Sequence, residues 1–388
     1  MSINESIRYA NERKDFKLKK LGFGLMRLPQ LDADDYTAVD IETTKKMADD
    51  FMANGFTYFD TAAPYHRGSS EAAFREAVVK RYPRTAYTIT DKLSLFMIHK
   101  AEDMPAFFEE QLKRLGLDYI DYYWLHGLGA PTYRQAEDFH AFEFVQELKA
   151  QGKVKHIGLS FHDKAVLLDE ILTKHPEMEY VQLQLNYLDW EDATVESRKC
   201  YEVAVKHHKP VIVMEPIKGG SLVNIPEEAK NLFSELRPEL SVASWAIRFA
   251  ATPDNVMMVL SGMSDEAQMA DNISYMKNFE PLNEQEQATI AKATELIKNS
   301  ITIPCTACRY CIDDCPKKIA IPDYFSIYNN LKRFGAKQGM VAMTYYGNLT
   351  QSHGKASECI KCGKCESHCP QHLTIRKYLE EVAATLEH

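Results

Sequence analysis

Short segments rich in β-branched and aromatic residues alternate with longer amphipathic segments over about the first 300 residues, and this alternation limits the fold more than any other feature. The strand-like segments are Leu21–Leu25, Thr57–Asp60, Ala86–Thr90, Tyr119–His126, Val154–Ser160, Tyr180–Asn186, Pro210–Met214 and Val256–Gly262. The stretches between them, such as SSEAAFREAVVK and MPAFFEEQLKRLG, space their apolar residues as helices do. Strands that alternate with helices form a parallel sheet. About eight units over ~250 residues predict an α/β fold of the (β/α)8 TIM-barrel type.

An open dinucleotide-binding sheet of the Rossmann type is the main alternative architecture. Its best phosphate-binding candidate is the pair Gly22 and Gly24, which follows the first predicted strand. The third glycine of that motif is missing, and Arg27, Leu28 and Pro29 stand where a helix should begin. We therefore reject this alternative.

Polar residues stand at the ends of four consecutive predicted strands. Asp60, Lys92, His126 and Ser160 close the second to fifth strands, at intervals of 32, 34 and 34 residues. Each interval is one strand–helix unit, and the carboxyl ends of barrel strands meet at one mouth, where such folds hold their active sites. Tyr65 follows Asp60 on the next loop and can reach the same mouth.

These residue types form a coherent catalytic set. A tyrosine is a weak acid at pH 7, and we expect a neighbouring Lys92 ammonium to lower the pKa of Tyr65. Asp60 would hold the lysine charged and in place, and His126 would hydrogen-bond a substrate oxygen. Each residue alone also has a structural explanation, such as a helix cap for Asp60. Their joint positions favour a site that protonates a carbonyl oxygen as hydride reaches its carbon.

The chain has nine cysteines, and all but Cys200 lie in two nearly identical runs near its end. Cys200 stands in a helical segment and is expected to be an inert buried thiol. The runs CTACRYCIDDCP and CIKCGKCESHCP both have the spacing C-x2-C-x2-C-x3-C-P. Zinc is the alternative for paired cysteines. This spacing is instead that of bacterial [4Fe–4S] proteins, and its duplication predicts two clusters.

In two-cluster ferredoxins, the fourth cysteine of each run binds the other cluster. If this holds here, one predicted cluster is bound by Cys305, Cys308, Cys311 and Cys369. The other is then bound by Cys359, Cys362, Cys365 and Cys315.

Helical patterns surround the second cysteine run. The stretch IPDYFSIYNNLKRFG places Tyr324, Tyr328 and Leu331 on one side, and LTIRKYLEEVAATL follows the run. This tail resembles the helical ferredoxin domains that are fused to redox enzymes. We expect an N-terminal extension over residues 1–20, a barrel over 21–300, and a small, mainly helical ferredoxin-like domain over 301–388.

Over Leu21–Phe279 the chain resembles the aldo/keto reductase family. The matching motifs are LGFG at Leu21–Gly24, FDTAAPY at Phe59–Tyr65 with Glu71 after it, Lys92 in TDK, His126 in WLH, GLS at Gly158–Ser160, QLNY at Gln184–Tyr187, and GMSDEAQMADN at Gly262–Asn272. With its tail, the chain resembles a bacterial group of iron–sulfur aldo/keto reductases. The resemblance implies that Asp60, Tyr65, Lys92 and His126 are the catalytic tetrad, with Tyr65 as the general acid.

The resemblance also implies a nicotinamide nucleotide, NADP or NAD, as cofactor. It places Ser160 and Gln184 at the carboxamide of the nicotinamide, Met214 at the ring, Lys218 near the pyrophosphate, Gly262 and Ser264 along the phosphates, and Gln268 and Asn272 near the adenine. Three departures matter. Phe161 and His162 stand where the family usually has Asn, and Met214 stands where an aromatic residue often stacks on the nicotinamide. Asp265 and Glu266 stand where the family often has Arg or Lys for the 2′-phosphate of NADP.

The net charge is −9, and basic residues are interspersed with acidic ones, so nucleic acid and anionic membranes are not expected partners. Residues 1–20 contain no apolar signal-peptide core, and a cytoplasmic location is predicted.

Three functions fit these patterns. The first is NAD(P)H-dependent reduction of a small-molecule carbonyl at the barrel mouth. The second is an electron-transfer module that links nicotinamide to a ferredoxin or flavoprotein partner, although the sequence shows no flavin fingerprint to split an electron pair. The third is a redox-sensing nucleotide-binding protein, which would need neither Tyr65 nor Lys92. The substrate and the oligomeric state are not predicted by the sequence.

Overall fold

The computed structural model describes residues 19–387, apart from 33, 193–194, 299–301, 335–341, 344–345, 348 and 351. The expected N-terminal extension over residues 1–20 therefore lies almost wholly outside the described residues. Within the described part of the chain, no helix combines the length and the apolar character that crossing a bilayer requires.

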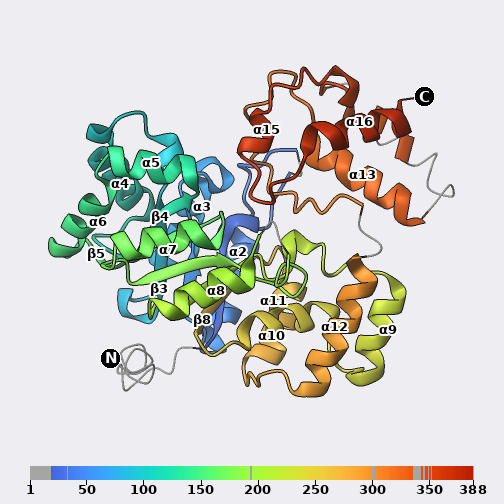
Figure 1. Cartoon of the computed structure of the whole chain (residues 1–388). Coiled ribbons are helices and arrows are strands. Elements are labelled where there is room, and N and C mark those ends of the chain that lie inside the picture. Colours follow the sequence, from blue (N-terminus) through green and yellow to red (C-terminus); the bar gives the residue numbers. More distant parts are fainter. Residues whose placement is uncertain are drawn as a thin grey trace.

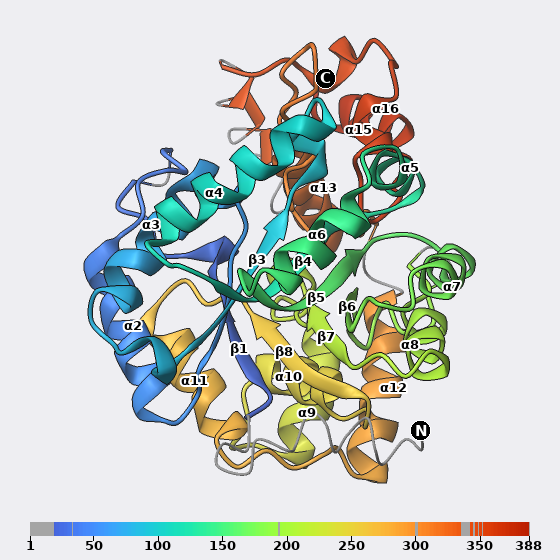
Figure 2. The ribbon, with the colours of Figure 1, turned by 90° about the vertical axis from the view of Figure 1, so that its left-hand side faces the viewer.

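Eight parallel strands close into a barrel in which each strand pairs with its neighbours in the chain, and β8 pairs with β1 (Figure 2). The strands are β1 (Leu21–Gly24), β2 (Tyr58–Asp60), β3 (Thr88–Leu93), β4 (Ile120–Leu128), β5 (Val154–Phe161), β6 (Tyr180–Gln184), β7 (Val211–Met214) and β8 (Val256–Ser261). The predicted barrel and all of its predicted strands are confirmed. The third strand continues beyond the predicted Thr90 to Leu93, and Lys92 is its next-to-last residue, where its backbone pairs in register with Trp124 of β4.

Helices surround the barrel (Figure 1). They are α2 (Ile41–Ala53), α3 (Ser69–Phe74), α4 (Met104–Leu115), α5 (Ala130–Asp138), α6 (Ala141–Ala150), α7 (Ala165–Lys174), α8 (Ser197–Lys206), α9 (Glu227–Leu236), α10 (Val242–Ala251), α11 (Glu266–Met276) and α12 (Glu284–Lys298). The helical segment MPAFFEEQLKRL is confirmed as α4, and Gly116 ends it with φ of 69°, a conformation that glycine adopts without strain.

Two apolar layers hold the barrel together. Between strands and helices, Phe23 of β1 and Phe59 of β2 pack against Phe51 of α2. Inside the barrel, the Trp124 ring of β4 lies against Gly158 of β5. A Cβ on Gly158 would stand 2.5 Å from the Tyr180 carbonyl oxygen and 2.6 Å from the Trp124 ring, so this position of β5 needs a glycine.

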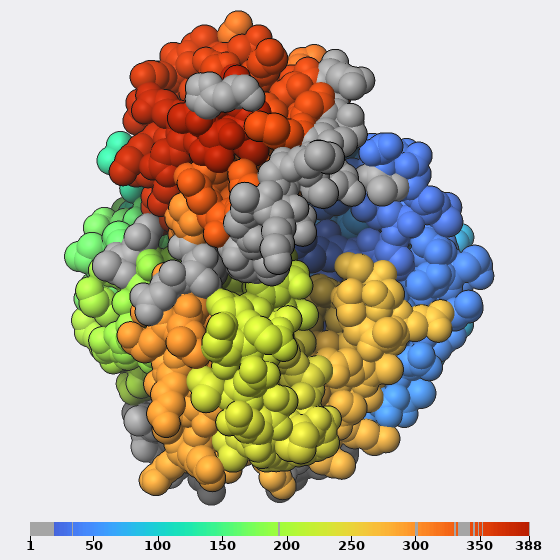
Figure 3. Space-filling view, turned by 90° about the vertical axis from the view of Figure 1, so that its right-hand side faces the viewer, coloured from blue at the N-terminus to red at the C-terminus, as the bar shows by residue number. Residues whose placement is uncertain are grey.

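The residues after α12 form a second, smaller unit with its own core, built on α13 (Ile321–Phe334), α15 (Lys364–Ser367) and α16 (Ile375–Leu386). Tyr324 and Tyr328 are buried in this core and Leu331 packs against it, as the helical pattern predicts. The three helices group together beside the barrel (Figure 1), and Figure 3 shows the same unit, orange to red, from another side.

Candidate active site

The four residues of the predicted tetrad meet at the carboxyl ends of β2, β3 and β4. Lys92 Nζ donates to Asp60 Oδ1 at 2.6 Å, to the backbone oxygen of Thr61 at 2.8 Å and to the Tyr65 hydroxyl at 3.3 Å. The rings of Tyr65 and His126 stand edge to face with centroids 6.1 Å apart. The barrel topology therefore brings together side chains that the sequence separates by one strand–helix unit each.

The tetrad is buried except for Tyr65, which is half-buried. Burial raises the pKa of Asp60, and the nearby Lys92 ammonium opposes that rise. Burial also raises the pKa of Tyr65 well above its ordinary value, and the negative charge of Asp60 acts in the same direction. The expected lowering of the Tyr65 pKa by Lys92 is thus wrong, because the lysine charge is already balanced by Asp60. Tyr65 keeps its proton at neutral pH.

His126 is held as a neutral ring. Burial lowers its pKa well below the ordinary value, and the positive charge of Lys92 adds to this effect. Its Nδ1 is hydrogen-bonded to the Ser94 hydroxyl at 2.7 Å, a partner that the sequence did not predict. Phe96 packs against the ring with centroids 5.4 Å apart. These contacts fix the ring and leave Nε2 for a ligand in the mouth.

The residues predicted to hold the nicotinamide lie at the ends of β5, β6 and β7. The Ser160 hydroxyl accepts from the backbone N–H of Gly127 at 2.7 Å. Gln184 pairs in register with Met214, so the two predicted contacts are neighbours on adjacent strands. Lys218, in the loop after β7, is buried and donates to Asp189 Oδ1 at 2.6 Å.

The residues predicted to hold the phosphates and adenine lie after β8, at the start of α11. The Ser264 hydroxyl donates to the backbone oxygen of Arg27 at 2.8 Å, and Asn272 accepts from the Ser261 hydroxyl at 2.9 Å. Asp265 caps α11, because its Oδ1 accepts from the Gln268 backbone N–H at 2.7 Å and its Oδ2 from the Gln268 side chain at 2.9 Å. Gly262 lies against the Arg27 side chain. A carboxylate thus stands at the helix start.

Four of the cysteines predicted to hold a cluster line one cavity, and they come from both runs: Cys305, Cys308, Cys311 and Cys369. Burial raises the pKa of the Cys308 thiol to about 12, and the charges of the nearby Cys369 and Cys305 contribute to this rise. The sulfur of Cys369 therefore belongs with the first run, as the two-cluster pattern requires.

The second group of cysteines also brings together residues of both runs. Burial raises the pKa of Cys365 to about 11, and the charges of Cys359 and Cys315 contribute to the rise. Cys362 is exposed. Among the described residues, all cysteines are free, and no three His, Cys, Asp or Glu side chains converge on one metal ion. A four-iron cluster does not need such convergence, because each cysteine binds a different iron atom.

The small unit is seated on the barrel mouth, and the residues that make this contact are ones that sequence reasoning missed. Gln371, two residues after Cys369, reaches Gln184 and Lys218. The backbone oxygen of Thr306 accepts from Arg27 at 3.5 Å. No periodicity or motif points to these contacts, since the partners are more than a hundred residues apart.

Two further polar groups enter the mouth without a predicted role. Glu215, after β7, has a buried Oε2 that accepts no hydrogen bond from the described residues, and burial raises its pKa. Tyr310 lies inside the first cysteine run. Burial raises its pKa well above the ordinary value, and the charges of Tyr65 and Glu215 raise it further. The only sequence signal for either residue was its position beside a predicted site residue.

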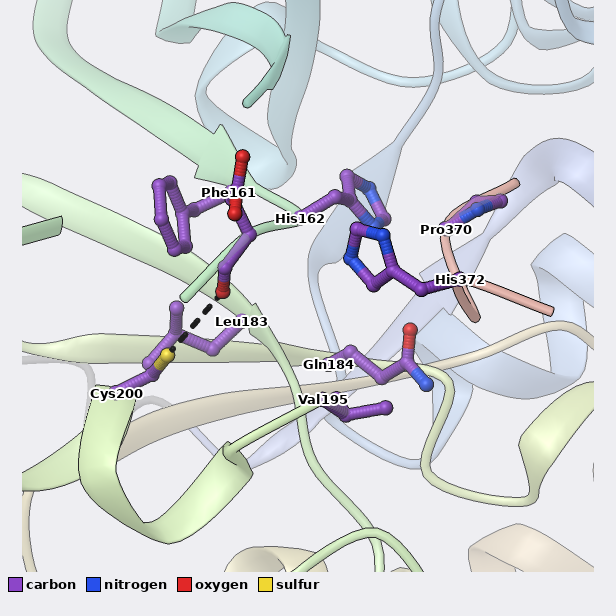
Figure 4. Close-up of a pocket in the computed structure, with 9 residues that line it drawn as sticks. Phe161, His162, Leu183, Gln184, Val195, Cys200, Pro370 and His372 are labelled. Atoms are coloured by element: carbon purple, nitrogen blue, oxygen red, sulfur yellow. Dashed lines mark hydrogen bonds between the residues drawn. The ribbon is translucent and has the colours of Figure 1, made fainter. Parts of the chain in front are cut away.

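A small pocket adjoins these contacts, and Figure 4 shows its lining. His162 and His372 approach each other from the barrel and the small unit, with Gln184 below them. Burial, together with the charges of His372 and Lys92, lowers the pKa of His162 to about 4. Its Nδ1 is buried without a hydrogen-bond partner among the described residues.

Comparison with known proteins matches both parts of the chain. A model of the aldo/keto reductase family matches residues 20–295, and a model of a 4Fe-4S dicluster domain matches residues 304–374. The "Uncharacterized oxidoreductase YqkF" of Bacillus subtilis is 24% identical over 311 residues, 72% of this chain and 94% of that protein. The "Probable aldo-keto reductase 1" of Glycine max is 34% identical over 156 residues, 37% of this chain and 42% of that protein.

Among solved structures, an aldo-keto reductase from Klebsiella pneumoniae in complex with NADPH aligns with a TM-score of 0.55 at 19% identity, over 71% of this chain and 90% of that one. At this identity the likeness shows the fold alone. The first family model, however, covers more than half of the chain. This chain is therefore an oxidoreductase that belongs to the aldo/keto reductase family and carries a C-terminal 4Fe-4S dicluster domain.

Proposed function

We propose that the chain reduces the carbonyl group of a small molecule with NADPH or NADH, and that Tyr65 is the general acid. The observation that carries this proposal is the buried hydrogen-bonded chain from Asp60 through Lys92 to the Tyr65 hydroxyl, which faces His126. A protonated tyrosine that is held beside a fixed ammonium group is suited to giving up a proton in the transition state.

Each residue has a defined role in this reaction. When bound, the reduced nicotinamide supplies the hydride. Tyr65 donates its phenolic proton to the carbonyl oxygen, and the Lys92 ammonium, 3.3 Å away, stabilises the phenolate that is left. Asp60 orients that ammonium. If Ser94 donates to Nδ1 of His126, Nε2 carries the ring proton and donates to the same carbonyl oxygen.

The residues at the mouth fit a nicotinamide nucleotide. Buried polar atoms without partners among the described residues, His162 Nδ1 and Glu215 Oε2, lie at the β5 and β7 sides of the mouth, beside the predicted cofactor residues. The choice between NADP and NAD turns on Asp265, whose carboxylate already occupies the start of α11 and disfavours a second anion there. Titration with NADPH and NADH decides this choice, and a much weaker affinity for NADPH would assign the site to NAD.

We further propose two [4Fe–4S] clusters, one in the cavity lined by Cys305, Cys308, Cys311 and Cys369. When bound, each cluster accepts or donates a single electron. Backbone N–H groups support the ligands, for example from Ala307 to Cys305 Sγ at 3.4 Å and from Ile319 to Cys315 Sγ at 3.5 Å. The second cluster would use Cys359, Cys362, Cys365 and Cys315.

A second candidate function is electron transfer between the nicotinamide site and an external ferredoxin or flavoprotein. The observation that favours it is the position of the first cavity, which shares Gln371 with the contact to the barrel mouth. The exposed Cys362 would place the second cluster near such a partner. A cytoplasmic location, as proposed from the sequence, would supply both the reducing environment and these partners.

An anaerobic assay tests these proposals. With a panel of aldehydes and ketones, we expect Tyr65→Phe to lower turnover by about 10²- to 10⁴-fold while the nucleotide affinity is retained. Retained turnover would contradict the role of Tyr65. A reduced-cluster EPR signal after addition of NADPH or NADH would support the electron-transfer function, and its absence would remove it. Zinc without iron in metal analysis would contradict the cluster proposal.

A further inference from the structure

Gln371 lies in the small unit built on α13, α15 and α16, which we call the cluster unit. Its side-chain amide and that of Gln184 of β6 form a reciprocal pair at the barrel mouth. Gln184 Nε2 donates to Gln371 Oε1 at 2.9 Å, and Gln371 Nε2 donates to Gln184 Oε1 at 2.8 Å. Lys218 Nζ also donates to Gln371 Oε1 at 2.9 Å. Asp189 completes a closed ring, because it accepts from Gln184 at 2.8 Å and from Lys218 at 2.6 Å.

This ring uses the hydrogen-bonding groups through which Gln184 would hold a ligand. A glutamine amide has two N–H donors and one carbonyl oxygen. Both donors of Gln184 are engaged, one by Asp189 and one by Gln371, and its oxygen accepts from Gln371. All four side chains of the ring are buried, with at most 5% of their surface exposed. A ligand that needs Gln184 has to replace Gln371.

The group that Gln371 presents is a primary carboxamide, which is the same group that a nicotinamide ring carries. Both offer one carbonyl oxygen and two N–H donors in a plane. A carboxamide that pairs reciprocally with Gln184 therefore makes the same two hydrogen bonds whether it comes from the protein or from a nucleotide. The other predicted carboxamide contact, Ser160, is engaged by the Gly127 N–H, and Phe161 offers no side-chain polar group.

We propose that Gln371 is an internal competitor for the carboxamide subsite, so that Gln184 pairs either with Gln371 or with the carboxamide of a nicotinamide nucleotide. This inference rests on the proposed function, because it needs a nicotinamide site at Gln184. A nucleotide then binds more weakly than its contacts alone allow, since the protein loses the Gln371 pair when the nucleotide enters.

The position of Gln371 connects this exchange to the first cluster cavity. Gln371 follows Cys369 by two residues and itself lines that cavity. The next residue, His372, lies outside the ring and faces His162 across the pocket in Figure 4. A displacement of the Gln371 side chain thus changes the surroundings of Cys369, and hydrogen bonding around the sulfurs is one factor that sets the properties of a cluster.

The test measures the affinity of two nucleotides for the full-length protein with its clusters. NAD⁺ or NADP⁺, whichever binds, carries the carboxamide, whereas ADP-ribose or its 2′-phosphate lacks the nicotinamide altogether. In Gln371→Leu, we expect the affinity for NAD⁺ or NADP⁺ to increase about five- to tenfold, because the two neutral hydrogen bonds between Gln184 and Gln371 no longer compete with the nucleotide. The affinity for the ADP-ribose probe should stay unchanged. His372→Ala, in the same loop but outside the ring, should change neither.

EPR of the reduced clusters gives a second readout that does not depend on turnover. Addition of the nicotinamide nucleotide should change the spectrum of the wild type and not that of Gln371→Leu, and the ADP-ribose probe should change neither. If Gln371→Leu does not retain its iron, Gln371→Asn keeps the carboxamide one methylene shorter and should give an intermediate affinity.

Several results would overturn the inference. Weaker binding of the nicotinamide nucleotide by Gln371→Leu would make Gln371 a cofactor contact instead of a competitor. An equal gain for both probes, or an equal gain in His372→Ala, would assign the effect to the loop and not to the carboxamide. Unchanged affinities together with turnover that Tyr65→Phe abolishes would remove the inference and leave the proposed function standing. Absence of any nucleotide binding would remove both.

Discussion

At the scale of single residues, the ion pair of Asp60 and Lys92 is a part of the site whose two charges must balance each other in the interior. Both side chains are almost fully buried, at 4% and 1% side-chain exposure, and their closest atoms are 2.6 Å apart. A buried pair of this kind contributes little to stability compared with an apolar pair, but removing one partner leaves an unbalanced charge in the interior.

We therefore expect Lys92→Met to lower the free energy of unfolding by about 3–5 kcal/mol, because Asp60 stays buried without its cation. The double variant Asp60→Leu with Lys92→Met should recover most of this loss. Denaturant unfolding, followed by near-UV circular dichroism under anaerobic conditions, measures both. Strictly additive losses in the two single variants and the double variant would contradict the pairing.

Asp91, the neighbour of Lys92 in β3, is a buried carboxyl on the opposite face of the strand, beside Glu71 of α3. Burial raises its pKa well above the ordinary value, and the Glu71 carboxylate pushes it further in the same direction. The native state therefore holds this proton more tightly than the unfolded chain does. Stability from this difference is complete below about pH 4 and is lost as the pH rises through the native pKa.

For this reason, the stability of Asp91→Asn relative to the wild type should increase as the pH rises from about 5 to about 8. Thermal unfolding at a series of pH values measures the difference. Asp40→Asn is the matched control, because hydrogen bonds from Thr43 lower the pKa of Asp40 and its contribution is constant above about pH 5. A difference for Asp91→Asn that does not vary with pH would show that its carboxyl titrates normally.

At the scale of strands and helices, most of the fold follows from the sequence. The alternation of short apolar runs and amphipathic segments predicts every strand of the barrel, and Gly116 marks the end of α4. Periodicity does not contain the register between strands, and so β3 extends to Leu93 while the pattern ends that strand at Thr90. The meeting of Asp60, Lys92 and His126 at one mouth was predictable because these residues recur once per unit, and Tyr65 follows Asp60 on the next loop.

The pairing of Gln184 with Gln371 was not predictable in this way, since 187 residues separate the two and no repeat relates them. The direction of the Tyr65 pKa also escaped prediction. It depends on how deeply the hydroxyl is buried and on Asp60 neutralising the lysine, and both are properties of the folded barrel.

Gly158 of β5 tests the packing inside the barrel. An added methyl group would meet the Tyr180 backbone and the Trp124 ring, so Gly158→Ala should lower the free energy of unfolding by about 1–3 kcal/mol or more. Gly24→Ala is the control, because its Cβ would stand 3.4 Å from the nearest atom, the Ser261 oxygen. Melting temperatures compare the two, and equal losses would mean that β5 can shift to make room.

At the scale of the whole molecule, the cluster unit forms one wall of the barrel mouth. The loop at Gly219 makes the tightest contact, because a Cβ on this residue would stand 2.1 Å from the Thr306 carbonyl oxygen. Gly219 and its neighbour Gly220 both have positive φ, at 64° and 92°, but only Gly219 touches the cluster unit. Substitutions at Gly219 and Gly220 therefore distinguish the effect of backbone strain from the effect of the contact with the cluster unit.

We expect Gly219→Ala to push the cluster unit away from the mouth and Gly220→Ala to leave it seated, although both substitutions strain the loop. Hydrogen exchange of the segments around Thr306 and Gln371 measures the seating, and faster exchange is expected in Gly219→Ala alone. Equal exchange in the two variants would assign the effect to loop strain.

The unequal exposure of the two cysteine groups has a consequence for the order in which oxygen damages the proposed clusters. In the first group Cys311 is buried and Cys305 and Cys308 are half-buried, whereas Cys362 of the second group is open to solvent. Oxygen attacks iron–sulfur centres where it can reach them, so damage should begin at the outer centre. The proposal of two clusters then predicts that brief exposure to air leaves a half-loaded protein, in which roughly half of the iron is gone, the remaining centre is the inner one and the wall of the barrel mouth is still in place.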